Sequence, residues 1–156
     1  MTFRDWLGNG WAQQQETSPR EIADLLAICD RDLKDAGIAR LSADARMSIA
    51  YNAALQCATA AVRAAGCRLT RERHHERTIE SLKYTLGLDG GVIAHLQAFR
   101  QKRNVSGYDA AGRVSDQEAA EMYDLATELR RMLLAWLKAS HPALLTLRYG
   151  SEPPRN

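Results

Sequence analysis

The sequence predicts an all-α fold, an antiparallel bundle of about five helices, and three observations support this prediction. Apolar residues recur every three or four positions over long stretches, as on the buried face of a helix. Most of these stretches open on a residue that can cap a helix, namely Ser18, Ser42, Asp89 and Ser115. No run alternates apolar and polar residues as a strand would. The 156 residues, 46% of them apolar, suit one packed domain.

Five helices are expected, near residues 19–36, 43–65, 71–86, 91–104 and 116–139. The first and the last begin at Ser-x-x-Glu capping boxes, and the first also has proline at its first helical position. The second is apolar nearly all round and rich in alanine, so we expect it to be the central helix. The third should begin after Thr70. Its side chains on one face should point into the bundle, namely His75, Ile79, Leu82 and Leu86.

The predicted core draws on all five helices, and its members follow from the helical period. They are Leu25, Leu26, Ile49, Leu55, Ala58, Val62, Ile79, Leu82, Leu96, Phe99, Leu125, Leu129 and Met132.

Both ends of the chain lie outside the predicted bundle of residues 18–140. Residues 1–17 form an N-terminal arm with four large apolar side chains, which we expect to dock either on the domain or on a second subunit. Residues 141–156 form a C-terminal tail that is polar at its end.

No segment has the length and apolarity of a membrane span or a signal peptide. Three cysteines without C-x-x-C spacing indicate reduced thiols, so we expect a cytoplasmic protein.

Charge excludes a protein that coats polyanions in general, because 21 basic and 19 acidic residues leave a net charge of only +2. Any contact with nucleic acid must then come from a local patch. Two basic clusters exist. One comprises Arg63, Arg68, Arg71, Arg73 and Arg77, and is interpreted as solvated arginines near helix ends; the other comprises Arg100, Lys102 and Arg103.

The candidate chemistry is concentrated between residues 100 and 109. The apolar row of the fourth helix continues to Arg103, so a guanidinium lies where a core residue was due. Asn104, Tyr108 and Asp109 follow it. On the residues alone, the favoured interpretation is a capped helix end in which Arg103 pairs with Asp109.

Metal and cofactor sites are not expected. Glu72-x-x-His75 has the spacing of a di-iron half-site, but the sequence offers no second copy and no further inward glutamates. Glycine-rich phosphate loops and nucleophile elbows are also missing from the sequence.

Two blocks resemble the HEPN superfamily of small prokaryotic helical-bundle proteins, and together they span residues 20–139. The first runs from Tyr51-Asn52-Ala53-Ala54 through the alanine-rich stretch to Gly66 and His74-His75. The second is Arg100-x-x-Arg103-Asn104-x-x-x-Tyr108-Asp109, which lies where the family has its Arg-x(4–6)-His motif. Tyr108 occupies the place of the histidine found in the ribonuclease members.

The resemblance implies an RNA- or nucleotide-binding module with a degenerate active-site motif. Arg103 and Tyr108 are then the candidate catalytic residues, and Arg100, Arg103, Asn104 and Asp109 the candidate binding residues. A homodimer is implied, because the family site joins two protomers, and so is a nucleotidyltransferase-type antitoxin partner. Two alternatives stay open: a metal-independent endoribonuclease acting as the toxin of a toxin-antitoxin pair, and a non-catalytic structural or interaction bundle.

Overall fold

The computed structural model describes residues 1–106 and 113–147, and it confirms the all-α class. Four long helices carry the fold: α2 (Pro19–Ala36), α3 (Ala43–Ala64), α6 (Gly90–Ser106) and α7 (Asp116–Ser140). The short elements are α1 (Phe3–Gly8), α4 (His74–Glu80), α5 (Leu82–Thr85), the 3-10 helix η1 (Pro142–Leu145), and the strands β1 (Ala12–Gln14) and β2 (Cys67–Leu69).

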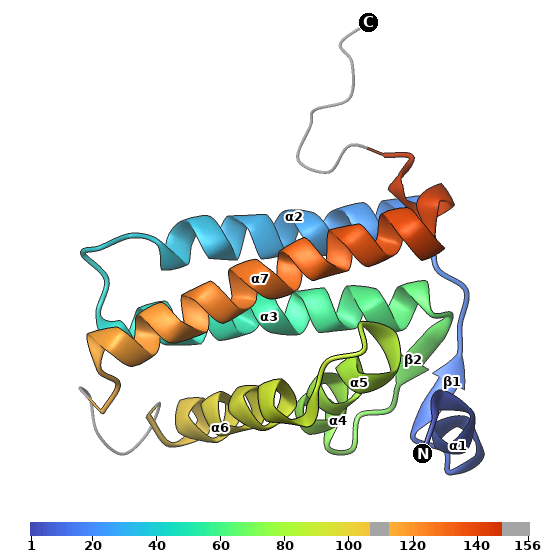
Figure 1. The fold of residues 1–156 in the computed structure, drawn as a ribbon, viewed down its shortest axis with the longest axis horizontal. Helices are drawn as coiled ribbons and strands as arrows, with labels where there is room; N and C mark the ends of the chain where they lie inside the picture. Colours follow the sequence, from blue (N-terminus) through green and yellow to red (C-terminus); the bar gives the residue numbers. More distant parts are fainter. Residues whose placement is uncertain (107–112, 148–156) are drawn as a thin grey trace, which may run out of the picture.

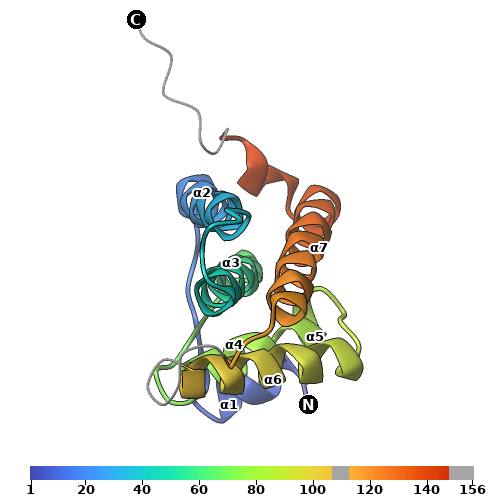
Figure 2. The same cartoon turned by 90° about the vertical axis from the view of Figure 1, so that its left-hand side faces the viewer.

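The long helices α2, α3 and α7 form one group, and α6 crosses beneath α3 and α7 (Figure 2). The small elements α1, β1 and β2 lie together beyond the C-terminal end of α3 (Figure 1). Helix α3 packs against α2, α4, α5, α6, α7 and β2, which confirms its prediction as the central helix. Its alanines explain this, because small side chains let several helices approach one axis.

Local capping residues start the long helices where the sequence predicted. Ser18 Oγ accepts a hydrogen bond from the Glu21 amide at 3.1 Å, and Ser42 Oγ accepts one from the Ala45 amide at the same distance. Ser115 and Glu118 form the expected capping box at α7. As a result, the bounds of all four long helices agree with the prediction to within two residues.

The predicted third helix, 71–86, is wrong in extent. Strand β2 occupies residues just before it, and the Thr70 amide donates to the Trp11 carbonyl at 3.0 Å instead of opening a helix. Helix α4 therefore starts only at His74, after Arg73 at φ +49°. Helices α4 and α5 meet at Ser81, whose hydroxyl donates to the Thr78 carbonyl at 2.6 Å. Hydroxyls that bind backbone carbonyls in this way bend helices.

The N-terminal arm docks on its own chain. Strand β1 pairs with β2 in an antiparallel register, with Gln13 opposite Arg68. Trp6 is only 2% exposed and packs edge-on against Phe3, Trp11 and Tyr84. The sequence showed no strand pattern because each strand has only three residues, and their pairing depends on segments far apart in the chain.

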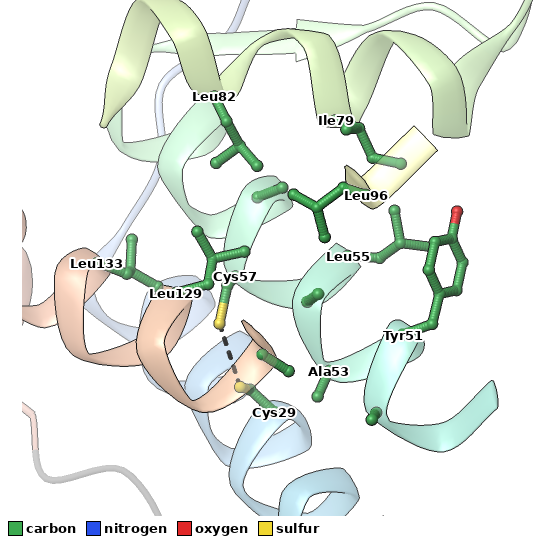
Figure 3. Close-up of a cluster of buried hydrophobic side chains, with 14 of the residues drawn as sticks. Cys29, Tyr51, Ala53, Leu55, Cys57, Ile79, Leu82, Leu96, Leu129 and Leu133 are labelled. Atoms are coloured by element: carbon green, nitrogen blue, oxygen red, sulfur yellow. Dashed lines mark hydrogen bonds between the residues drawn. The ribbon is translucent and has the colours of Figure 1, made fainter. Parts of the chain in front are cut away.

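The main core lies between the long helices (Figure 3). Most of the predicted core residues are buried; Leu25, Ile49, Leu125 and Met132 are half-buried and pack against it. Cys29 and Cys57 meet inside it as free thiols, with their sulfurs 3.2 Å apart. Among the described residues, no helix combines the length and apolarity needed to cross a membrane.

Candidate functional site

The end of α6 brings a positive charge against a buried aromatic ring. The predicted row holds, since Leu96 and Phe99 are buried and Arg103 is half-buried. The Cζ atom of Arg103 lies 5.0 Å from the centroid of the Tyr51 ring on α3. A cation over an aromatic face is attracted by the ring quadrupole. Arg103, the last member of the apolar row of α6, is therefore in contact with the central helix α3.

The Tyr51 hydroxyl is a buried polar group. The side chain is 1% exposed, and its oxygen forms no hydrogen bond with any residue in 1–106 or 113–147. Figure 3 shows the hydroxyl at the edge of the core cluster, pointing away from the leucines. Burial raises the pKa of Tyr51 to about 12, although Arg103 and Arg100 oppose the rise. The phenol is therefore neutral at pH 7 and able to donate a hydrogen bond.

Arg100 is held in place from α4. Its Nε donates to Gln97 Oε1 at 2.7 Å, and Gln97 Nε2 donates to the Glu76 carbonyl at 2.9 Å. The two terminal nitrogens of Arg100 make no hydrogen bond or ion pair with the described part of the chain. Gln97 thus orients a guanidinium whose terminal donors are not used by the described residues.

His75 joins this group from α4. The sequence placed it in an inward row, and that is wrong: the side chain is exposed, because α4 starts later than predicted. Its pKa is lowered, first by partial desolvation and then by the positive charges of His74, Arg103 and Arg100. An imidazole with a lowered pKa is neutral at pH 7.

Two of these four residues escaped the prediction of the site. The HEPN motif predicts a histidine after Arg103, whereas His75 precedes Arg103 in the sequence and comes near it through the packing of α4 beside α6. Tyr51 was named only as part of the HEPN resemblance and was given no role in the site. The signal that could have found both was the first block of the HEPN resemblance, which contains Tyr51 and His75.

The remaining predicted site residues differ in their placement. Asn104 is exposed in the last turn of α6. Tyr108 and Asp109 lie outside the described residues, and so does the predicted ion pair between Arg103 and Asp109. Lys102 forms an ion pair with Glu118 of α7, which together with hydrogen bonds from Ser115 lowers the pKa of Glu118. The charge of Lys102 is therefore neutralised by Glu118, whereas that of Arg100 has no such partner among the described residues.

No group of three potential metal ligands occurs in the described ranges 1–106 and 113–147. Comparison of the chain with protein-family models, with curated proteins and with solved structures gave no match.

Proposed function

We propose that the protein is a HEPN-like module that binds phosphate groups of RNA or of a nucleotide between α4 and α6. The α4–α6 site comprises Arg100, Arg103, His75 and Tyr51. The observation that carries the proposal is geometric: Arg100 and Arg103 lie one turn apart at the end of α6, where Gln97 orients Arg100 and the Tyr51 ring lies under Arg103.

The chemistry of these side chains suits a phosphate. Guanidinium groups bind phosphate oxygens through two parallel hydrogen bonds, and both arginines are permanently charged at neutral pH. The buried Tyr51 ring lies under the Arg103 guanidinium, and the exposed Asn104 amide lies one residue beyond Arg103. Cations at the C-terminal end of a helix also interact favourably with the helix dipole. A purely structural role for the two arginines is therefore the competing explanation.

A second candidate function is metal-independent endoribonuclease activity, and His75 is the observation that favours it. A phenol with an ordinary pKa of about 10 is a poor general base at pH 7, which counts against Tyr108. The lowered pKa of His75 keeps its imidazole neutral and able to accept the proton of a ribose 2'-hydroxyl. Arg100 and Arg103 would then hold the phosphate under attack.

The homodimer and the nucleotidyltransferase-type partner belong to the same proposal, since both come from the HEPN resemblance. A family site of this kind is completed by the same residues of a second protomer. Sedimentation equilibrium of the full chain tests the dimer, which should have twice the monomer mass of 17.4 kDa.

Binding is tested with a fluorescent single-stranded RNA and a labelled nucleotide, measured by anisotropy at a fixed salt concentration. Arg100→Gln with Arg103→Gln should weaken binding at least tenfold while the melting temperature changes little. Arg40→Gln, an exposed arginine in the α2–α3 loop, is the control for loss of charge. If the double variant instead melts several degrees lower and binds as well as the wild type, the arginines are structural.

Cleavage is tested on a labelled RNA with a chelator present, from about pH 6 to 9. His75→Gln should lower turnover and leave affinity nearly unchanged. A wild-type protein that cleaves nothing over this range rejects the endoribonuclease and leaves the binding proposal standing.

A further inference from the structure

We propose that a second anion site lies between α3, β2 and the start of α4, and that it binds the polyphosphate chain of a small ligand such as a nucleoside triphosphate. The site, here called the β2 cavity, has a volume of about 530 Å³. Its polar lining consists of Gln13, Arg63, Arg68, Thr70, Arg71 and His74.

A tight turn brings the first two arginines together. Gly66 has a φ of +82°, a conformation that glycine adopts without strain, and it reverses the chain between α3 and β2. Arg63 lies in the last turn of α3, and Arg68 lies at the middle of β2. Cys67 and Leu69 on either side of Arg68 are buried, so the alternation of the strand turns Arg68 outward.

The loop after β2 and the first residue of α4 supply the rest of the polar lining. The hydroxyl and the amide of Thr70 both bind the Trp11 carbonyl, at 3.2 and 3.0 Å, and this fixes the loop against the arm. Arg71 follows directly. His74 Nδ1 lies 3.1 Å from the Thr70 carbonyl and therefore donates to it.

The charges of the β2 cavity are poorly compensated. Arg63 has an ion pair with Glu21, but the distance of 3.8 Å is long. The side chains of Arg68 and Arg71 make no hydrogen bond or ion pair with the residues that the structure describes. The other two arginines of the sequence cluster differ: Arg73 pairs with Glu76, and Arg77 lies over the Trp11 ring. Like charges held around one hollow repel each other, and a multivalent anion removes that repulsion.

Shape favours a small ligand over an RNA strand. The volume falls within the roughly 300 to 1,000 Å³ typical of small-molecule sites. The polar side chains come from α3, β2, a loop and α4 and line one hollow, whereas an RNA strand needs a row of contacts along its backbone. His74 lines the cavity and the next residue, His75, belongs to the α4–α6 site, so α4 contributes to both sites.

The experiment is isothermal titration calorimetry of the full chain with ATP and with inorganic tripolyphosphate. Both should bind, because the phosphate chain is what the cavity recognises. Arg68→Gln with Arg71→Gln should weaken both at least tenfold without lowering the melting temperature, since both side chains are exposed. The control Arg40→Gln, also at an exposed position, should bind both compounds as the wild type does.

Four results would overturn the inference. Wild-type protein could bind neither compound at millimolar concentration, or the Arg68 and Arg71 changes could leave binding intact. Loss of binding in the Arg100 and Arg103 variant alone would assign the ligand to the α4–α6 site. Finally, a single-stranded RNA that binds more tightly than ATP, and depends on Arg68 and Arg71, would make the cavity part of an RNA surface. Because the α4–α6 site is tested with its own variants, either proposal can fail alone.

Discussion

The guanidinium of Arg103 lies over the ring of Tyr51, with Cζ 5.0 Å from the ring centroid. This contact joins the last turns of α6 to the central helix α3. Partial burial of a charge costs free energy unless a favourable interaction compensates for it. A cation–π contact contributes about 0.5 to 2 kcal/mol of such compensation. The same contact places the Arg103 charge beside a hydroxyl that has no hydrogen-bond partner among the described residues.

Replacing Tyr51 with phenylalanine separates the ring from the hydroxyl. Tyr51→Phe keeps the ring under Arg103 and removes a buried polar group, so we expect the free energy of unfolding at pH 8 to rise by about 1 kcal/mol. Urea unfolding measures this. A fall of more than 1 kcal/mol would show that the hydroxyl has a partner that stabilises the fold.

The same variant should change the response to alkaline pH. Unfolded Tyr51 ionises near pH 10, but the folded phenol does so only at about 12, so the wild type loses stability as pH rises from about 10 to about 12. The loss from this group alone is about 2 to 3 kcal/mol at most. Tyr51→Phe should lack it. Tyr123→Phe on α7 is the matched control and should still show the loss.

The pKa of His75 reports on the α4–α6 site. In the wild type it should lie below 6.5, and Arg100→Gln with Arg103→Gln should raise it, because two nearby positive charges are removed. NMR titration of the imidazole protons measures both values. Arg40→Gln should leave the pKa of His75 unchanged. An equal pKa in wild type and double variant would place the arginines too far from His75 to share a ligand.

The lowered pKa of His75 also predicts how stability depends on pH. The unfolded state takes up the His75 proton near pH 6.5, and the folded state does so only at lower pH. Stability contributed by the neutral imidazole is therefore present above pH 6.5 and is lost as pH falls below it. His75→Gln should lose less stability than the wild type between pH 7.5 and 5 in urea unfolding.

The central helix should not tolerate a larger side chain at Ala58, which is 1% exposed. Ala58→Leu inserts three carbons into a packed core, so we expect a cost of about 1 to 3 kcal/mol. Ala98→Leu makes the same change at an exposed position of α6 and should cost less than about 0.5 kcal/mol. Equal melting temperatures for Ala58→Leu and the wild type would show that the core around α3 is loosely packed.

The thiols should be unreactive in the folded protein. All three cysteines are buried, and a hydrogen bond with Cys29 together with burial raises the pKa of Cys57 well above its usual value. Burial also raises the pKa of Cys67. Ellman's reagent should therefore modify the native protein very slowly and all three thiols in urea. Two missing thiols in urea would indicate a disulfide between Cys29 and Cys57.

Local interactions made much of the fold predictable. A capping serine and the amide three residues later lie within one turn, so Ser18, Ser42 and Ser115 mark helix starts without reference to the rest of the chain. The helical period likewise predicted that Arg103 ends a buried row. The choice between docking the arm on its own domain and docking it on a second subunit could not be made in this way.

What the sequence by itself determined were the long helices, the central place of α3 and one half of the candidate site, Arg100 and Arg103. Tertiary structure alone decided the rest. Pairing of β1 with β2 holds Thr70 to Trp11, so α4 starts late, its first histidine lines the β2 cavity, and His75 comes under the influence of Arg103. The physical reason is distance along the chain: these contacts join segments whose meeting depends on the packing of the whole molecule, and no local pattern encodes it.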